Sequence, residues 1–116
     1  MITIYHNPRC TKSREGLCEL ENLKKSVIVR KYLDEPFTKE ELIDVLKKLA
    51  IKPFDLVRTK EAIWIEQYKG KEMSDDAIID AMLLHPKLIE RPIVVFGDKA
   101  VIARPKEKIN ELLSQF

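Results

Sequence analysis

The chain has 116 residues and a formal net charge of +2, with 34% charged and 45% hydrophobic residues. This length suits one domain, 1–116, with a single core, and the near balance of charge points to no nucleic-acid or membrane partner. No segment approaches the ~18 apolar residues of a membrane span, and no signal peptide is recognisable. Cys10 and Cys18 are too few for a disulfide framework, so we expect a cytoplasmic protein.

The first elements place a cysteine at the start of a helix. Residues 2–5 form a short apolar run typical of a buried strand, Asn7-Pro8 ends it, and a helical pattern starts at about Thr11. Cys10 therefore lies at a helix N-terminus, where unpaired N–H groups carry about half a positive charge.

Basic residues surround Cys10. Arg9, Lys12 and Arg14 lie within four residues of it, and His6 lies four residues upstream. Cations and a helix N-terminus favour the thiolate, which is the nucleophilic form of cysteine. A cysteine packed in a core rarely has three cationic neighbours, so we interpret Cys10 as a reactive thiol.

The spacing of residues around Cys10 restricts the kinds of reaction that it could carry out. Cys10-Thr-Lys-Ser13 has the frame of a Cys-x-x-Cys redox site, with a hydroxyl group in place of the second thiol. Such a site cannot close a disulfide across its own turn. Cys10 to Arg14 is too short for the Cys-x5-Arg loop of cysteine phosphatases, yet a nucleophilic sulfur among anion-binding groups still indicates an oxyanion substrate.

The next elements predict a βαβ unit. Leu17, Leu20 and Leu23 give the first helix an apolar stripe, and a β-branched run at 27–29 predicts the second strand. Two strands joined in this way by a helix are parallel, with a right-handed crossover. We expect Cys18, on the flank of the stripe, to be a small apolar filler.

A helical segment follows the βαβ unit. Thr38 begins a Thr-Lys-Glu-Glu capping box that opens a second helix, and Pro53 ends this helix. Residues from about 54 to 90 contain no strand pattern. We therefore predict a helical insertion there.

Turn and cap residues divide this insertion into helices. One is expected over about 60–67 and another from Ser74, with His85 as its C-terminal cap and with Trp64 and Met82 in the core. No group of His, Cys and acidic residues has the spacing of a metal site, so we predict no metal and no bound cofactor.

The chain ends in a predicted hairpin and helix. Residues 92–96 and 99–103 are expected to form two strands that turn at Gly97-Asp98, and Pro105 to open the last helix. Its apolar residues at helical spacing are Ile109, Leu112, Leu113 and Phe116. A parallel βαβ unit joined to an antiparallel ββα unit predicts an α/β fold, a thioredoxin-like mixed four-stranded sheet with flanking helices.

Three arginines lie where elements begin or end. Arg91 and Arg104 each precede a proline, which favours extended backbone, and Arg58 precedes a predicted helix. Pro92, just before a strand, is a candidate for a cis peptide bond. Guanidinium groups match tetrahedral oxyanions in forked geometry. The spacing alone leaves two interpretations open, an anion site and three surface arginines.

Four motifs resemble the glutaredoxin-dependent arsenate reductases, in order and spacing over essentially the whole chain. They are His-Asn-Pro-Arg-Cys-Thr-Lys-Ser-Arg at 6–14, Leu-Val-Arg-Thr-Lys-Glu at 56–61, Leu-Ile-Glu-Arg-Pro-Ile-Val-Val at 88–95 and Ile-Ala-Arg-Pro at 102–105. The resemblance implies a thioredoxin-like fold with a helical insertion. It also implies that Cys10 is catalytic and that His6 favours its thiolate. The residues that it implies as substrate-binding are Arg58, Arg91, Arg104, Ser13 and Arg14.

The same resemblance implies a mechanism and partners. The substrate is arsenate or a similar oxyanion, glutathione is the co-substrate, and glutaredoxin is the partner protein. Cys10 attacks arsenic(V) and an oxygen leaves as water. Glutathione then attacks the adduct and reduces the arsenic, and glutaredoxin removes glutathione from Cys10.

Two alternatives follow from the loop at Cys10. Its Cys-Thr-Lys-Ser-Arg sequence differs from the Cys-Gly-Thr-Ser-Arg of well-characterised members and also resembles the Spx-type regulators, which bind RNA polymerase and sense oxidation through Cys-x-x-Cys. Ser13 removes that switch, and Arg58, Arg91 and Arg104 favour the enzyme. The alternatives are an Spx-like regulatory protein and a glutathione-dependent thiol reductase that does not act on arsenate.

Overall fold

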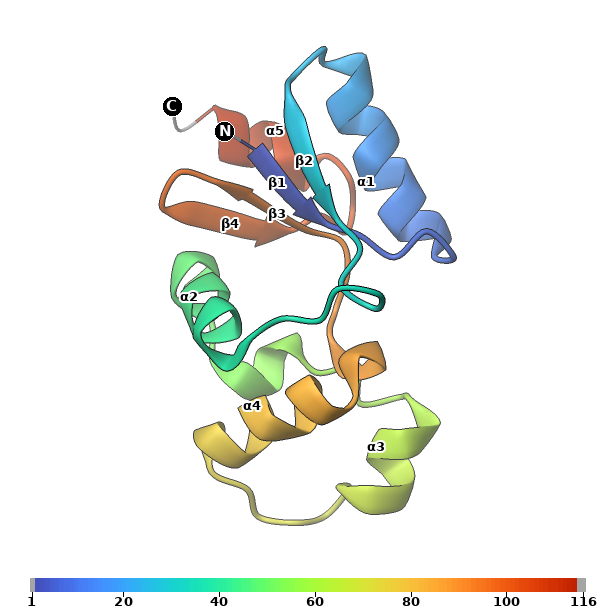
Figure 1. Cartoon of the computed structure of the whole chain (residues 1–116), viewed down its shortest axis with the longest axis vertical. Coiled ribbons are helices and arrows are strands. Elements are labelled where there is room, and N and C mark those ends of the chain that lie inside the picture. Colours follow the sequence, from blue (N-terminus) through green and yellow to red (C-terminus); the bar gives the residue numbers. More distant parts are fainter. Residues whose placement is uncertain (1, 115–116) are drawn as a thin grey trace. The chain divides into compact units, whose positions relative to one another are not determined.

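A computed structural model describes residues 2–114 of the chain (Figure 1). They form two compact units. The first combines Met1–Glu35 with Arg91–Phe116, and the second is Pro36–Glu90. The predicted insertion begins at about 54, whereas the second unit begins at Pro36 and so also contains the helix that the Thr38 capping box opens.

The first unit holds a four-stranded mixed sheet. Its elements are β1 (Ile2–Tyr5), α1 (Thr11–Asn22), β2 (Val27–Arg30), β3 (Ile93–Phe96), β4 (Lys99–Ile102) and α5 (Lys108–Leu113). The strand order is β2-β1-β3-β4. β1 pairs parallel with β2 and antiparallel with β3, and β3 pairs antiparallel with β4. The predicted thioredoxin-like sheet, with its βαβ unit and its hairpin, is confirmed.

One hydrophobic core joins this sheet to α1 and α5. Its buried members are Ile2, Ile4, Leu20, Val94, Ala103, Ile109 and Leu112. Ile2 and Ile4 alternate along β1 with half-buried Thr3 and Tyr5, as expected for a strand with one face in the core. Burial of such aliphatic side chains is the main stabilising term of this unit, at about 1.5–3 kcal/mol each.

The buried face of α1 differs from the predicted leucine stripe. Leu23 is 37% exposed and caps the helix C-terminus, whereas Ser13, Gly16 and Leu20 are buried. A Cβ atom at Gly16 would lie 2.8 Å from Cγ of Pro92. Glycine therefore lets the helix approach Pro92 more closely than any side chain permits.

Two other predictions for this unit were wrong. α5 begins at Lys108, not at Pro105, because the N–H groups of Lys108 and Ile109 first donate to carbonyls three residues back, in a tighter turn. Cys18 is exposed, so it fills no core; its Sγ lies 3.8 Å from Nδ2 of Asn22. Phe116, the last residue of the predicted apolar stripe, lies outside the described residues.

The second unit is built from helices. They are α2 (Lys39–Leu49), η1 (Pro53–Leu56), α3 (Ala62–Gln67), α4 (Asp75–Leu84) and η2 (Pro86–Leu88). The capping box at Thr38 is confirmed, with hydrogen bonds of 2.9 and 3.1 Å to Glu41. α2 ends four residues before Pro53, because Ala50 adopts a left-handed conformation with φ of 56°.

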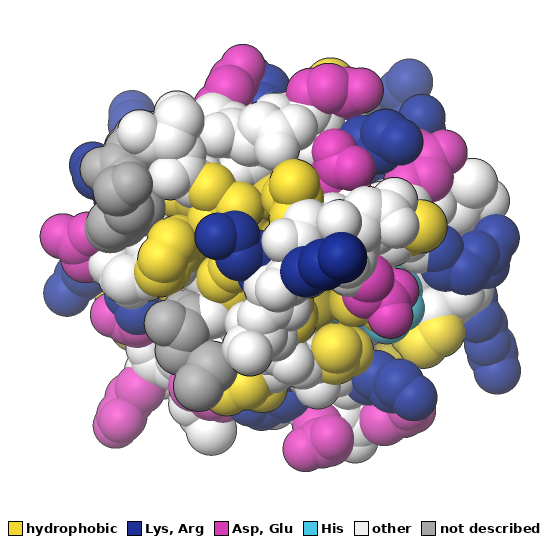
Figure 2. Space-filling model, turned by 90° about the horizontal axis from the view of Figure 1, so that it is seen from above, with side chains coloured by type: hydrophobic (Ala, Val, Ile, Leu, Met, Phe, Trp, Pro, Cys, Tyr) yellow, Lys and Arg dark blue, Asp and Glu magenta, His cyan; other side chains and the backbone are white. Residues whose placement is uncertain are grey.

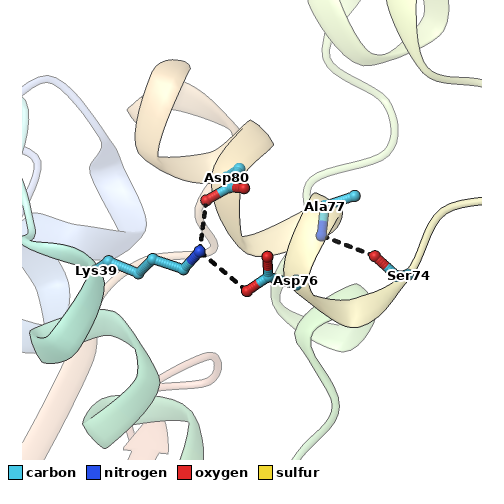
Figure 3. A network of polar contacts seen from close by, with 5 residues as sticks. All are labelled: Lys39, Ser74, Asp76, Ala77 and Asp80. Carbon is cyan, nitrogen blue, oxygen red and sulfur yellow. Dashed lines mark hydrogen bonds and ion pairs between the residues drawn. The ribbon is translucent and has the colours of Figure 1, made fainter.

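Polar contacts and core residues fix α4. Ser74 caps its N-terminus through the N–H of Ala77, and His85 is its C-cap, as predicted. The ammonium group of Lys39 on α2 lies 2.9 Å from a carboxylate oxygen of Asp76 and 3.0 Å from one of Asp80 (Figure 3). Inside this unit, the predicted core residues Trp64 and Met82 are 6% and 0% exposed.

The helices of residues 2–114 are all too short or too polar to cross a membrane.

The close approach of α1 to Pro92 makes Gly16 sensitive to substitution. Gly16→Ala should lower the free energy of unfolding by about 1–2 kcal/mol, because overpacking a rigid proline ring outweighs the helix propensity gained. Urea denaturation measures this. Cys18→Ala, at an exposed position of the same helix, is the control and should change stability by less than about 0.5 kcal/mol. Equal stabilities of the two variants would contradict the packing argument.

Candidate functional site

The strand register brings several sequence-predicted residues to one end of the sheet. Tyr5, the last residue of β1, pairs with Arg30 on one side and with Ile93 on the other. Ile93 in turn pairs with Ile102. The segments next to these four residues, which are the loop after β1, the start of the turn after β2, Arg91-Pro92, and Ala103-Arg104, therefore meet at that end.

Cys10 occupies the N-cap position of α1. Its backbone is extended, with φ of −98° and ψ of 124°, and no side chain caps the helix. Its N–H donates to the carbonyl of Asn7 at 3.0 Å, and its carbonyl accepts from the N–H of Arg14 at 3.0 Å. Cys10 is half-buried and not in a disulfide. The predicted position of its thiol at a helix N-terminus is thus observed, and the helix dipole favours negative charge there.

Ser13 fastens the loop that carries Cys10. Its side chain is fully buried, and its Oγ accepts from the N–H of Asn7 at 2.9 Å and lies 2.7 Å from Nδ1 of His6. The side chain of Asn7 accepts from the N–H of Arg9 at 3.0 Å. The hydroxyl group of Ser13 therefore faces into the protein, between the end of β1 and the first turn of α1.

His6 is held in its neutral form. Burial lowers the pKa of His6 below its usual value of 6.5, and the positive charges of Lys31 and Arg14 also lower this pKa. A hydrogen bond with the backbone of Ser13 raises the pKa in part. The imidazole is therefore uncharged at neutral pH. The Oγ atom of Ser13 accepts from Asn7 and also bonds Nδ1 of His6, where the tautomer of the imidazole decides which of the two groups donates.

Arg14 braces the same loop from outside. Its Nη1 donates to the carbonyl of Pro8 at 2.9 Å, and its Nη2 donates to Oγ1 of Thr11 at 3.2 Å. Both contacts tie the guanidinium group to residues on either side of Cys10. A fixed positive charge is thus held at the start of α1.

The two prolines beside the sheet end follow cis peptide bonds, at Arg91-Pro92 and Arg104-Pro105. The N–H of Ala103 donates to the carbonyl of Pro92 at 2.9 Å, which joins the two segments. Arg91 and Arg104 are half-buried. Within residues 2–114, the buried Nε of Arg91 has no hydrogen-bond partner.

Arg58 belongs to the second unit. Its Nη1 lies 2.6 Å from Oε1 of Glu61, and its Nε lies 3.5 Å from Oε1 of Glu90. The backbone of Arg58 is also fixed, because its N–H donates to the carbonyl of Leu88 at 2.7 Å. Of the predicted site residues, the first unit contains His6, Cys10, Ser13, Arg14, Arg91 and Arg104, and the second contains Arg58.

The site also contains residues that the sequence did not single out. Lys31, directly after β2, acts on His6 through its charge, and Asn7 links Ser13 to Arg9. Gly16 permits the contact with Pro92. A glycine on the inner face of a helix was the only signal that could have revealed this contact.

Neither a metal-binding cluster in residues 2–114 nor a patch of one charge on the face shown in Figure 2 adds a second candidate site. In the described residues no group of three His, Cys, Asp or Glu side chains could hold a metal ion. Basic and acidic side chains are interspersed around hydrophobic ones in the face shown in Figure 2. That distribution agrees with the nearly balanced composition.

Comparisons with known proteins agree on one family. The ArsC family model matches residues 5–112. An arsenate reductase of Haemophilus influenzae is 40% identical over 114 residues, 97% of this chain and 98% of that protein. The uncharacterized protein YfgD of Escherichia coli is 42% identical, over 97% and 96%. The structure of an arsenate reductase from Vibrio cholerae is 44% identical with a TM-score of 0.91, over 95% of both chains.

The lowered pKa of His6 predicts a pH dependence of stability. The unfolded chain takes up a proton at about pH 6.5, whereas folded His6 does so only at lower pH. The unfolded state then binds more protons, so stability is lost as the pH falls below 6.5. Urea denaturation between about pH 7.5 and 5.5 should show a smaller loss for His6→Asn, whose amide can still hydrogen-bond Ser13 but does not titrate. Equal losses would show that His6 is not held neutral.

Proposed function

Because the chain belongs to the ArsC family, we propose that it is a thiol-dependent arsenate reductase in which Cys10 is the nucleophile. The observation that carries this proposal is the position of Cys10, at the uncapped N-terminus of α1 and in a loop braced by Arg14. Unpaired helix N–H groups and a fixed guanidinium stabilise both a thiolate and the oxyanion that it attacks.

The first step is substitution at arsenic. The sulfur of Cys10 forms a bond to arsenic(V), and an arsenic–oxygen bond breaks. The hydroxyl group that leaves takes up a proton from solvent and departs as water. Arg91 and Arg104 enter the same end of the sheet as the Cys10 loop and would bind the remaining oxygens. The unpartnered Nε of Arg91 supports this role, because a buried donor without an acceptor is stabilised by an incoming anion.

The second step transfers two electrons. A glutathione thiolate attacks the sulfur of Cys10, a sulfur–sulfur bond forms, and the electron pair of the breaking sulfur–arsenic bond reduces arsenic(V) to arsenic(III). The products are arsenite and a mixed disulfide between Cys10 and glutathione. Glutaredoxin then takes the glutathione by thiol–disulfide exchange and restores the thiol.

The geometry of α1 supports an external reductant. Cys18 lies eight residues after Cys10, which corresponds to a rise of about 12 Å along a helix. A disulfide requires Cα atoms within about 7 Å, so these two cysteines cannot pair while α1 is intact. Ser13, at the position of a second thiol, cannot resolve the adduct either.

A groove beside the loop has the charges that glutathione requires. Asn7, Pro8, Arg9, Lys31, Leu33 and Asp34 line a cavity of about 230 Å³. Two cations and one carboxylate there are complementary to the two carboxylates and one ammonium group of glutathione. Arg9, which lines the groove, is next to Cys10 in the chain.

Neutral His6 has a positioning role in this proposal. Because its imidazole carries no charge at neutral pH, it does not stabilise a thiolate as a cation would. It acts instead through Ser13, whose hydroxyl group fixes the loop around Cys10.

Cys10→Ser should abolish arsenite formation in an assay with arsenate, glutathione and glutaredoxin, because serine cannot form the arsenic adduct or the mixed disulfide. Cys18→Ala is the matched control and should keep wild-type activity. Mass spectrometry after turnover without glutaredoxin should find glutathione on Cys10. An internal Cys10–Cys18 disulfide would refute the one-thiol mechanism. Thiol reductase activity without arsenite formation would favour the alternative of a glutathione-dependent thiol reductase that does not act on arsenate.

Substitution of the arginines tests the anion site. Arg91→Ala and Arg104→Ala should lower kcat/KM for arsenate by an amount on the order of 1.5–3 kcal/mol, roughly 10- to 150-fold. Arg91→Lys should also be impaired, because lysine lacks the fork. Arg58→Ala should be impaired less, since Glu61 and Glu90 already partly neutralise Arg58.

Circular dichroism would establish that each variant is folded. Wild-type kinetics in all three alanine variants would place the anion site elsewhere.

A further inference from the structure

The second unit contains a recess with aromatic and basic walls. Its volume is about 480 Å³, and it lies between η1, α3 and the chain on either side of α3. The aromatic residues are Phe54, Trp64 and Tyr68, and the basic residues are Lys60, Lys69 and Lys71. None of them belongs to the candidate active site.

The aromatic side chains form a continuous wall. Trp64 stacks on Tyr68 with ring centroids 5.3 Å apart and an interplanar angle of 27°. The edge of Phe54 meets Trp64 at 6.0 Å and 63°. Trp64 is 6% exposed, whereas Phe54 and Ile65, which also line the recess, are 50% and 49% exposed. The buried indole thus supports Phe54, and Phe54 and Ile65 are the apolar side chains that are open to a ligand.

The rim of the recess is positively charged. No acidic residue lines it. Within residues 2–114, Lys60, Lys69 and Lys71 make no ion pair, while nearby Glu61 is engaged by Arg58. The rim is open at Gly70, where a Cβ atom would meet no atom within 4 Å. An apolar wall beside three unpaired ammonium groups is complementary to an aromatic molecule with negative charge.

We propose that this recess binds a small planar anion, namely an aromatic ring that carries a carboxylate or phosphate group. Its volume lies within the range of about 300–1,000 Å³ that is usual for small-molecule sites. The ring packs against Phe54 and Ile65, where aromatic faces prefer offset or edge contacts. The anionic group lies toward the three lysines.

Titration of the ¹⁵N-labelled full chain, followed by NMR, tests this site. Trp64 is the only tryptophan, so its indole N–H is a single reporter in the wall, and the Gly70 amide reports from the rim. Adenosine monophosphate represents the nucleotides, and benzoate represents simple aromatic acids. The probe that binds more tightly shows which of the two classes of ligand the recess prefers. Either should shift both signals saturably. Adenosine lacks the charge and inorganic phosphate lacks the ring, so each should bind more weakly than adenosine monophosphate.

A charge-matched pair of variants provides the control. Lys60→Gln/Lys69→Gln/Lys71→Gln should weaken binding of the tighter probe about tenfold, because three exposed charge contacts each contribute a small factor. Lys25→Gln/Lys99→Gln/Lys106→Gln removes the same charge from exposed positions of the first unit and should bind as the wild type does. Both variants should keep wild-type arsenate turnover, which separates this proposal from the proposed function.

Three results would overturn the proposal. The first is that neither aromatic anion shifts the signals of Trp64 and Gly70. The second is that inorganic phosphate binds as tightly as adenosine monophosphate, since the aromatic wall would then contribute nothing. The third is that both triple variants lose affinity equally, since the attraction would then come from net charge alone.

Discussion

The hydroxyl group of Ser13 fixes the geometry on which the candidate site depends. It is fully buried and bonded to both the backbone of Asn7 and the ring of His6, so one oxygen atom joins the end of β1 to the first turn of α1. Buried polar groups stabilise a structure only when they are paired, and here the hydroxyl has two partners. Cys10 lies in the short loop that these bonds close.

Packing one turn further along α1 has a complementary effect. Gly16 allows the helix to lie against Pro92, and Pro92 accepts a hydrogen bond from Ala103. Through Pro92, the helix that carries the thiol therefore contacts the segment of Arg91, and this segment is hydrogen-bonded to the segment of Arg104. Positive charge reaches the loop from Arg14 and Lys31, while His6 stays neutral. In the proposed function, electrostatic support for the anion thus comes from fixed cations and helix N–H groups, and His6 positions the loop through Ser13.

Patterns of local sequence predicted most of the fold. Apolar and β-branched runs identified the strands, and helical spacing identified the helices. The capping box at Thr38 and the N-cap Ser74 marked two helix starts, and the Gly97-Asp98 turn marked the hairpin. Predictions failed where tertiary contacts decide. Leu23 looked like core but caps α1, and Gly16 looked unremarkable although Pro92 requires it. The start of α5 depends on how the chain leaves β4, which no local pattern encodes.

The absence of a second thiol near Cys10 has a consequence for oxidation. When peroxide converts a thiolate to a sulfenic acid, a neighbouring cysteine normally captures it as a disulfide and prevents further damage. Ser13 cannot do this, and Cys18 is about 12 Å along the helix. Oxidised Cys10 therefore depends on a thiol from solution, and where that thiol is scarce it proceeds to sulfinic acid, which is not reduced again. For Cys10, the nucleophile of the proposed reaction, recovery from oxidation is thus set by the thiol pool around the protein.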